Sequence, residues 1–229
     1  MKITNPIIEA TFIKRLNRFE AQVDIHGQTN LVHVPNSGRC KELFIPGAPV
    51  FLEVRNRPGR KTPYELSYVL KGRRLISIDS SVPNKVFYEA LLNKKIEEFA
   101  TYDEVLREKN YGESRLDIML KTTDDICYIE VKGVTLEEND VAMFPDAPTQ
   151  RGVKHVNELI KIKESGMRAA IVFVIQMDGI KYFTPNDRTD PDFGAALRLA
   201  VSKGVETYAY TCNVDLDNIS IKDRAEIML

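Results

Sequence analysis

Two neighbouring segments decide how the second half of this chain folds: SRLDIML at Ser114–Leu120 and ICYIEVKG at Ile126–Gly133. In each segment apolar and polar residues alternate, which is the period-two pattern of a β-strand with one buried face. An antiparallel hairpin that turns around residues 123–124 places Asp117 directly opposite Glu130. The two acids then share a face with Arg115, Met119, Tyr128 and Lys132, while the opposite face is uniformly apolar and is expected to pack in the core.

The paired acids indicate a metal site, because two adjacent carboxylates repel each other unless a positive charge lies between them. Carboxylate oxygens at this spacing suit Mg²⁺ or Mn²⁺. Lys132 lies on the same face and is placed to orient a water molecule as nucleophile, while the cation stabilises charge on a phosphoryl oxygen. The hairpin therefore predicts a catalytic site for phosphodiester hydrolysis. The competing interpretation is a solvated pair of acids neutralised by Arg115 and Lys132, and this short pattern does not exclude it.

The elements around the hairpin indicate an α/β domain. Helical spacing of apolar residues predicts helices over 84–99, 150–164 and 191–203, and Pro83, Asp190 and Gly204 mark helix ends. Residues 169–176 form a β-branched apolar run typical of a buried strand, and 205–212 is expected to be the last strand. This order predicts a sheet with helices on both faces.

The first 80 residues predict a small all-β unit. Alternation over 19–25 and 50–55, with further strands over 64–70 and 75–78, is typical of a five-stranded barrel of the oligonucleotide-binding (OB) type. Residues 1–85 hold 14 Lys and Arg against 7 Asp and Glu, whereas the remainder holds 18 against 26. A basic first half is expected to contact a polyanion, although a merely alkaline domain is an equal alternative.

Composition excludes several classes of protein. No apolar run approaches the length of a membrane span, and the N-terminus lacks the apolar stretch of a signal peptide. The three cysteines lie far apart, without a Cys-x-x-Cys pair, so neither a disulfide framework nor a zinc site is expected. We therefore expect a cytoplasmic protein with no membrane partner.

Five strings along the chain resemble the sugar fermentation stimulation protein family (SfsA): NRFEAQV, HVPNSGRCKELFIPG, NYGESRLDIML, YIEVKGVTL and FPDAPTQRGVKHVNEL. The resemblance implies an OB-like nucleic-acid-binding barrel over 1–83 and a C-terminal domain over 84–229 with the PD-(D/E)XK, restriction-endonuclease-like fold. It also implies non-specific DNA binding with a regulatory role in sugar metabolism.

Carried over by position, the nuclease pattern puts its metal-binding acids on Asp117 and Glu130 and its lysine on Lys132. The literal Pro-Asp is absent, because Leu116 precedes Asp117. The fold usually places another acid on its first helix, and Glu89 is expected there. Glu108 and Glu113 are alternatives nearer the hairpin.

Further candidates flank this core. Arg151 and His155 lie one helical turn apart and are expected to face the site, as a phosphate ligand and as a proton carrier or structural histidine. Asp146 is expected to cap the helix or support Arg151. Arg39 and Lys41, after Gly38, and the basic residues Arg15 and Arg18 are expected to contact nucleic acid.

Three functions remain open from the residues. The first is a Mg²⁺- or Mn²⁺-dependent nuclease acting on DNA, with RNA as an alternative substrate. The second is a non-catalytic DNA-binding regulator that retains the nuclease fold. The third and weakest is a glycosidase, since opposed acids are close enough for a retaining mechanism. A homodimer is compatible with all three and would help to span a duplex.

Overall fold

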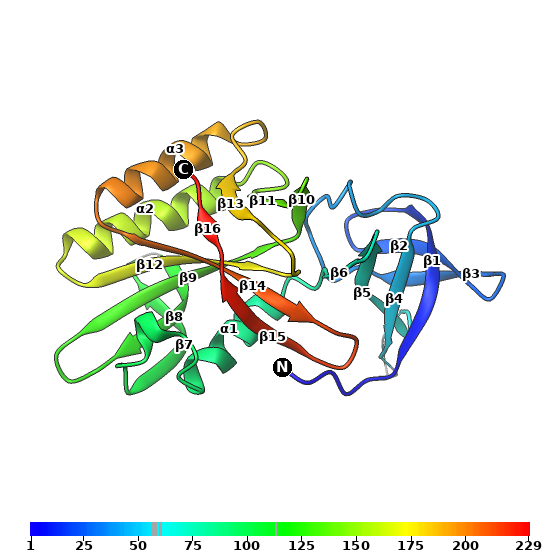
Figure 1. The fold of residues 1–229 in the computed structure, drawn as a ribbon, viewed down its shortest axis with the longest axis horizontal. Coiled ribbons are helices and arrows are strands. Elements are labelled where there is room, and N and C mark those ends of the chain that lie inside the picture. Colours follow the sequence, from blue (N-terminus) through cyan, green and yellow to red (C-terminus); the bar gives the residue numbers. More distant parts are fainter. Residues whose placement is uncertain (56–58, 60, 113) are drawn as a thin grey trace.

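The computed structural model describes residues 1–55, 59, 61–112 and 114–229, which form a β-barrel and a larger α/β domain (Figure 1). The barrel consists of β1 (Ile7–Arg15), β2 (Glu20–Ile25), β3 (Gln28–His33), β4 (Pro49–Val54), β5 (Tyr64–Lys71) and β6 (Arg74–Ser77). Strand order β3-β2-β1-β4-β5-β6, with β3 also pairing β5, closes five strands on themselves. The predicted OB-like barrel is confirmed.

The α/β domain is built on a six-stranded sheet of order β15-β14-β12-β9-β8-β7. Its strands are β7 (Glu104–Tyr111), β8 (Ser114–Lys121), β9 (Ile126–Val134), β12 (Arg168–Ile175), β14 (Glu206–Val214) and β15 (Ile219–Arg224). The central strands β9, β12 and β14 are parallel. A smaller sheet joins β10 (Leu136–Glu138), β11 (Val141–Phe144), β13 (Tyr182–Pro185) and β16 (Glu226–Ile227).

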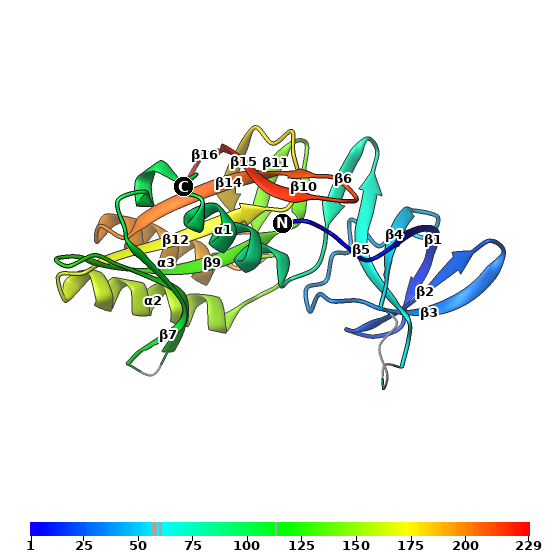
Figure 2. The ribbon, with the colours of Figure 1, turned by 90° about the horizontal axis from the view of Figure 1, so that it is seen from below.

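Helices cover both faces of the large sheet, as predicted (Figures 1 and 2). Along β12, Ile171 and Phe173 pack with α2 (Gln150–Glu164) and α3 (Pro191–Ser202), whereas Val172 and Val174 pack with α1 (Val82–Leu92). Successive side chains of a strand point to opposite faces, so a strand covered on both sides is apolar throughout. This explains the uninterrupted apolar run at this position.

The barrel and the α/β domain are joined by backbone as well as side-chain contacts. Ser77 donates its N–H to the carbonyl of Gln176, and Ser80 donates to that of Pro35. The chain start also lies on the α/β domain, because Ile3 donates to the carbonyl of Asp217 (Figure 2).

Several predicted boundaries need correction. The helix predicted over 84–99 begins at Val82 and ends at Leu92, because Asn93 caps it and Lys94 takes a positive φ of 54°. Residues Glu97–Phe99 form a separate 3-10 turn. Residues 205–212 are not in the last strand, since β15 and β16 follow β14.

In the part of the chain that the structure describes, eight strands are not indicated by the sequence pattern: β7, β10, β15 and β16 lie at sheet edges, whereas β1, β3, β11 and β13 each pair on both sides. The edge strand β7 is mostly exposed and carries charged residues, which edge strands commonly use to avoid pairing with other chains. Within the described residues, no helix combines the length and the apolar character needed to cross a bilayer.

Candidate active site

The β8–β9 hairpin has the predicted register. Ile118 pairs with Ile129 and Met119 with Tyr128, and the turn closes with a bond from Thr122 N–H to the Asp125 carbonyl. Beyond these pairs, a side chain joins the two strands in place of a backbone hydrogen bond: Asp117 Oδ2 accepts the N–H of Val131 at 2.9 Å. Asp117 is thereby held against the strand that carries Glu130.

Glu130 is the buried centre of the site, with 3% of its surface exposed. Its Oε1 accepts a hydrogen bond from Lys132 Nζ at 2.6 Å and a short one from His155 Nδ1. Its Oε2 is buried and, among the described residues, has no hydrogen-bond partner. A buried carboxylate oxygen without a donor is costly, so this atom is available as a ligand for a cation.

The two acids differ in how readily they ionise. Burial raises the pKa of Asp117, and the nearby charge of Glu130 raises it further, while the Val131 N–H, Lys132 and Asn84 oppose the shift. Burial also acts to raise the pKa of Glu130, but its hydrogen bond with His155 and the Lys132 ammonium outweigh burial and lower it. Glu130 therefore ionises more readily than Asp117, and an added positive charge would favour the ionised form of Asp117.

His155 is a positioning group for Glu130 in this geometry. It is 7% exposed and lies on α2, whose first turn is capped by the Thr149 side chain. Arg151 Nε donates to His155 Nε2 at 3.4 Å, and since an arginine Nε can only donate, Nε2 must be the acceptor. With Nε2 as the acceptor, Nδ1 carries the proton and donates it to Glu130. The structure thus brings Asp117, Glu130, Lys132 and His155 together, with Arg151 at the exposed edge.

Asn84 is a site residue, although the sequence pattern indicates it only as the start of a helix. Its Nδ2 donates to Asp117 Oδ1 at 2.7 Å from the first turn of α1. The predicted acid of this helix, Glu89, is elsewhere: it is half exposed and pairs with the N-terminal ammonium of Met1 at 2.9 Å. Glu108 pairs with the exposed Arg115, and Glu113 lies outside the described residues.

The two carboxylates suit a cation that keeps much of its own hydration. In the described part of the chain, no group of three or more His, Cys, Asp and Glu side chains is arranged to hold a metal. Mg²⁺ typically binds through one or two carboxylates and retains several waters. The buried Oε2 of Glu130, without a donor among the described residues, and the neighbouring carboxylate of Asp117 therefore fit Mg²⁺ or Mn²⁺.

Arg15, predicted to contact nucleic acid, is instead a clamp inside the barrel domain. All five of its N–H groups donate to backbone carbonyls, those of Asn17, Arg18, Asn36, Gly38 and Arg39, at 2.6–3.1 Å. No donor is left for a phosphate, because a guanidinium has only five. The other three predicted contacts, Arg18, Arg39 and Lys41, are exposed and line one surface groove on the barrel.

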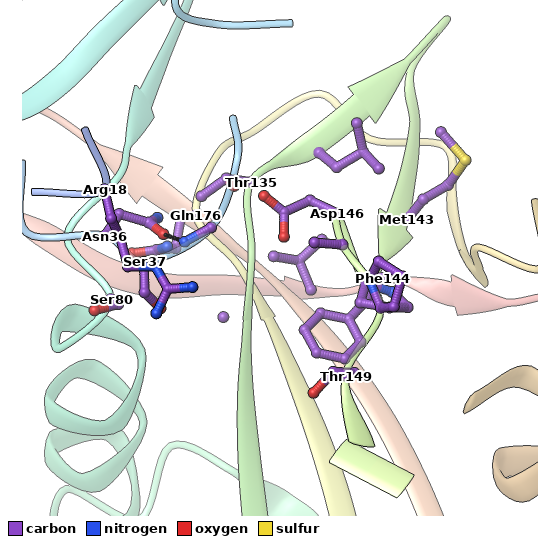
Figure 3. Close-up of a pocket in the computed structure, with 17 residues that line it drawn as sticks. Arg18, Asn36, Ser37, Ser80, Thr135, Met143, Phe144, Asp146, Thr149 and Gln176 are labelled. Carbon is purple, nitrogen blue, oxygen red and sulfur yellow. Dashed lines mark hydrogen bonds between the residues drawn. The ribbon is translucent and has the colours of Figure 1, made fainter. Parts of the chain in front are cut away.

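A cavity of about 370 Å³ lies at the domain junction (Figure 3). Arg18, Ser37 and Ser80 line one side, and Phe144 and Thr149 line the other. Its wall includes residues 133–136, which directly follow Lys132 on β9. The cavity therefore lies between barrel residues, among them Arg18, and the C-terminal end of the strand that carries Glu130 and Lys132.

Asp146, expected to cap α2 or support Arg151, binds the barrel. Its Oδ2 accepts the N–H of Arg39 at 2.7 Å and that of Cys40 at 3.1 Å, while Thr149 caps the helix. A Cβ at Gly38 would lie 2.6 Å from this oxygen, so only glycine allows the approach.

Comparisons with known proteins agree with this architecture. A model of the "SfsA N-terminal OB domain" matches residues 13–78, and one of the "Sugar fermentation stimulation protein RE domain" matches residues 81–218. Curated sugar fermentation stimulation protein homologues are similar over their full or nearly full length: 63% identity in Thermoanaerobacter sp. (strain X514), covering 100% of both chains, and 53% in Clostridium botulinum (strain Kyoto / Type A2), covering 99%. The solved structure of Pyrococcus furiosus SfsA in complex with Ca²⁺ matches with a TM-score of 0.90 and 30% identity, covering 100% of both chains.

Proposed function

The chain belongs to the sugar fermentation stimulation protein family, and from this premise we propose that it binds DNA and cleaves phosphodiester bonds at a Mg²⁺- or Mn²⁺-dependent site. The observation that carries the proposal is the cluster of Asp117, Glu130 and Lys132, which has the spacing of the PD-(D/E)XK pattern and one buried carboxylate oxygen without a donor. The relative from P. furiosus was solved in complex with Ca²⁺, which supports a divalent cation as a ligand of this chain.

Asp117 and Glu130 are the residues that would hold the cation. Bound there, it supplies positive charge that stabilises the charge developing on the phosphoryl oxygens. Lys132 is 13% exposed at its side chain and uses one N–H for Glu130, which leaves donors to orient an attacking water. Asn84 and the Val131 N–H fix Asp117, and His155 fixes Glu130, so both acids are preorganised.

The substrate contacts divide between the two domains. Arg151 lies exposed at the start of α2, where its planar fork suits a phosphate. Arg18, Arg39 and Lys41 supply positive charge in the surface groove of the barrel, and Arg18 also lines the junction cavity. We therefore place the nucleic acid across the junction, and we expect the protein to act in the cytoplasm, since its three cysteines are free and buried.

The second candidate is a DNA-binding regulator of sugar metabolism that no longer cleaves. One observation favours it. Glu130 Oε1 already accepts hydrogen bonds from Lys132 and His155, so one of the two oxygens of that carboxylate is satisfied without a metal. The family name, sugar fermentation stimulation protein, is consistent with a regulatory role.

The test is cleavage of labelled DNA and RNA oligonucleotides with Mg²⁺ or Mn²⁺, together with calorimetric Mn²⁺ binding. We expect Asp117→Asn to lose metal binding and to reduce cleavage by a factor of at least about 10²–10³. Asp124→Asn is the matched control, because Asp124 lies exposed in the turn of the same hairpin. Equal cleavage by wild type and Asp117→Asn contradicts the proposal, and binding without cleavage under every metal favours the regulator.

A further inference from the structure

The barrel presents an aromatic side chain that its core does not use. Phe12 and Tyr68 are each 1% exposed and belong to the apolar core, whereas Phe19 is 50% exposed. Phe19 lies in the β1–β2 connection, and its ring stacks on that of His33 at a centroid distance of 6.4 Å and an interplanar angle of 20°. In OB folds this connection is one of the loops that contact oligonucleotides.

The loop holds Phe19 in place before any ligand arrives. The Phe19 N–H donates to Asn17 Oδ1 at 2.8 Å, and its carbonyl accepts the N–H of Val34 at 2.8 Å. Arg15 fixes the carbonyls of Asn17 and Arg18. A preordered aromatic ring loses little conformational entropy on binding, which favours its use as a contact.

The charges around Phe19 suit a phosphate backbone. Arg18 precedes it and lines both the basic surface groove and the junction cavity (Figure 3). Within the residues that the structure describes, no acidic side chain forms an ion pair with Arg18, Arg39 or Lys41. The neighbouring Glu20, by contrast, is neutralised by Lys61.

We propose that Phe19, stacked on His33 and flanked by Arg18, is a stacking site for an unpaired base of single-stranded nucleic acid. Every base has a π face, whereas the bases of a duplex are already stacked on each other and cannot reach an aromatic ring on a barrel surface. In this binding mode Arg18 contacts the phosphates of the strand, which continues towards the junction cavity that Arg18 lines.

This placement gives the substrate class of the site, and it rests on the proposed function. The cavity of about 370 Å³ is near the lower end of the range of small-molecule sites, so it admits one strand and not a duplex. Arg18 lines this cavity, so a strand stacked on Phe19 extends from the barrel towards the domain junction.

The experiment uses the absence of tryptophan from this chain. Phe19→Trp places a single tryptophan at the stacking site, and Leu199→Trp, on α3 at a 49% exposed position, places one far from the barrel. Each protein is titrated, without metal, with a single-stranded DNA, the same sequence as RNA, and a duplex whose ends are closed by flexible linkers that carry no bases. Anisotropy of the labelled oligonucleotide measures binding in parallel.

We expect single strands to quench Phe19→Trp but not Leu199→Trp, and the closed duplex to quench neither. Relative quenching by DNA and RNA shows which strand is preferred. Phe19→Leu, which keeps apolar bulk without a π face, should weaken single-strand binding about 5- to 150-fold, the loss of one stacked base. Binding by anisotropy without quenching, or equal quenching by the closed duplex, overturns the proposal. Because no metal is present, a failure of cleavage does not affect these readouts.

Discussion

The contact between Asp146 and the barrel loop makes a quantitative prediction about the domain junction. In Asp146→Ala, the N–H groups of Arg39 and Cys40 lose an acceptor at 2.7 Å and 3.1 Å. Hydrogen bonds to a charged group contribute about 1.5–3 kcal/mol each, and the bond to the exposed Arg39 belongs at the lower end or below. The Cys40 bond is worth more, because Cys40 is 0% exposed and its N–H is left without a partner.

We therefore expect Asp146→Ala to lower the free energy of unfolding by about 2–4 kcal/mol. For a chain of this length each kcal/mol shifts the melting temperature by roughly 2–4 °C, so the expected decrease is about 4–16 °C. Thermal unfolding followed by circular dichroism measures it. Asp124→Ala, exposed in the β8–β9 turn, is the control and should stay within about 0.5 kcal/mol of wild type.

A second substitution tests whether the geometry itself is right. In Gly38→Ala the new Cβ would lie 2.6 Å from Asp146 Oδ2, so the variant alone should be destabilised. Removing Asp146 removes that clash, and the double variant should be more stable than the two separate losses predict. Melting of Asp146→Ala within about 1 °C of wild type, or strict additivity of the pair, would refute this account of the junction.

Three further predictions concern the acidic cluster and the Arg15 clamp. Burial raises the pKa of Asp117, so the ionised carboxylate destabilises the fold above that pKa, and this cost is relieved as the pH falls through it. At neutral pH the metal-free Asp117→Asn protein should therefore melt no lower than wild type in calorimetry. A clearly lower melting temperature would contradict the direction of the pKa shift. Asn84→Ala removes a hydrogen-bond donor that favours the ionised form of Asp117, so protonation of Asp117 should weaken Mn²⁺ binding at a higher pH than in wild type. Calorimetric titrations over a range of pH measure this. An unchanged pH dependence at the acid side would show that this hydrogen bond does not act on the carboxylate. Arg15→Lys keeps the charge but loses the planar guanidinium, so it should lower the free energy of unfolding by about 1–3 kcal/mol in thermal unfolding. The control Arg18→Lys should change it by less than about 0.5 kcal/mol. Equal effects of the two substitutions would argue against the Arg15 clamp.

Local sequence was enough to place the central part of the candidate site. The strands of the hairpin adjoin a tight turn, and side chains alternate with period two, so the facing of Asp117, Glu130 and Lys132 follows from spacing alone. Helix α2 begins and ends at the predicted residues, because a cap, a proline and a glycine mark it within the chain. The barrel and the α/β order were predictable for the same reason, since alternation and helical periodicity are local signals.

Tertiary packing decided which other side chains reach this pair. Asn84 and Glu89 are five residues apart, about 140° around a helix, so only one can face the acids, and the docking of α1 on β9 selects Asn84. Likewise Asp146 meets the N–H groups of Arg39 and Cys40, which are 107 and 106 residues away, only once both domains have folded. Contacts this distant depend on how whole elements pack, and no periodicity within a single segment carries that information.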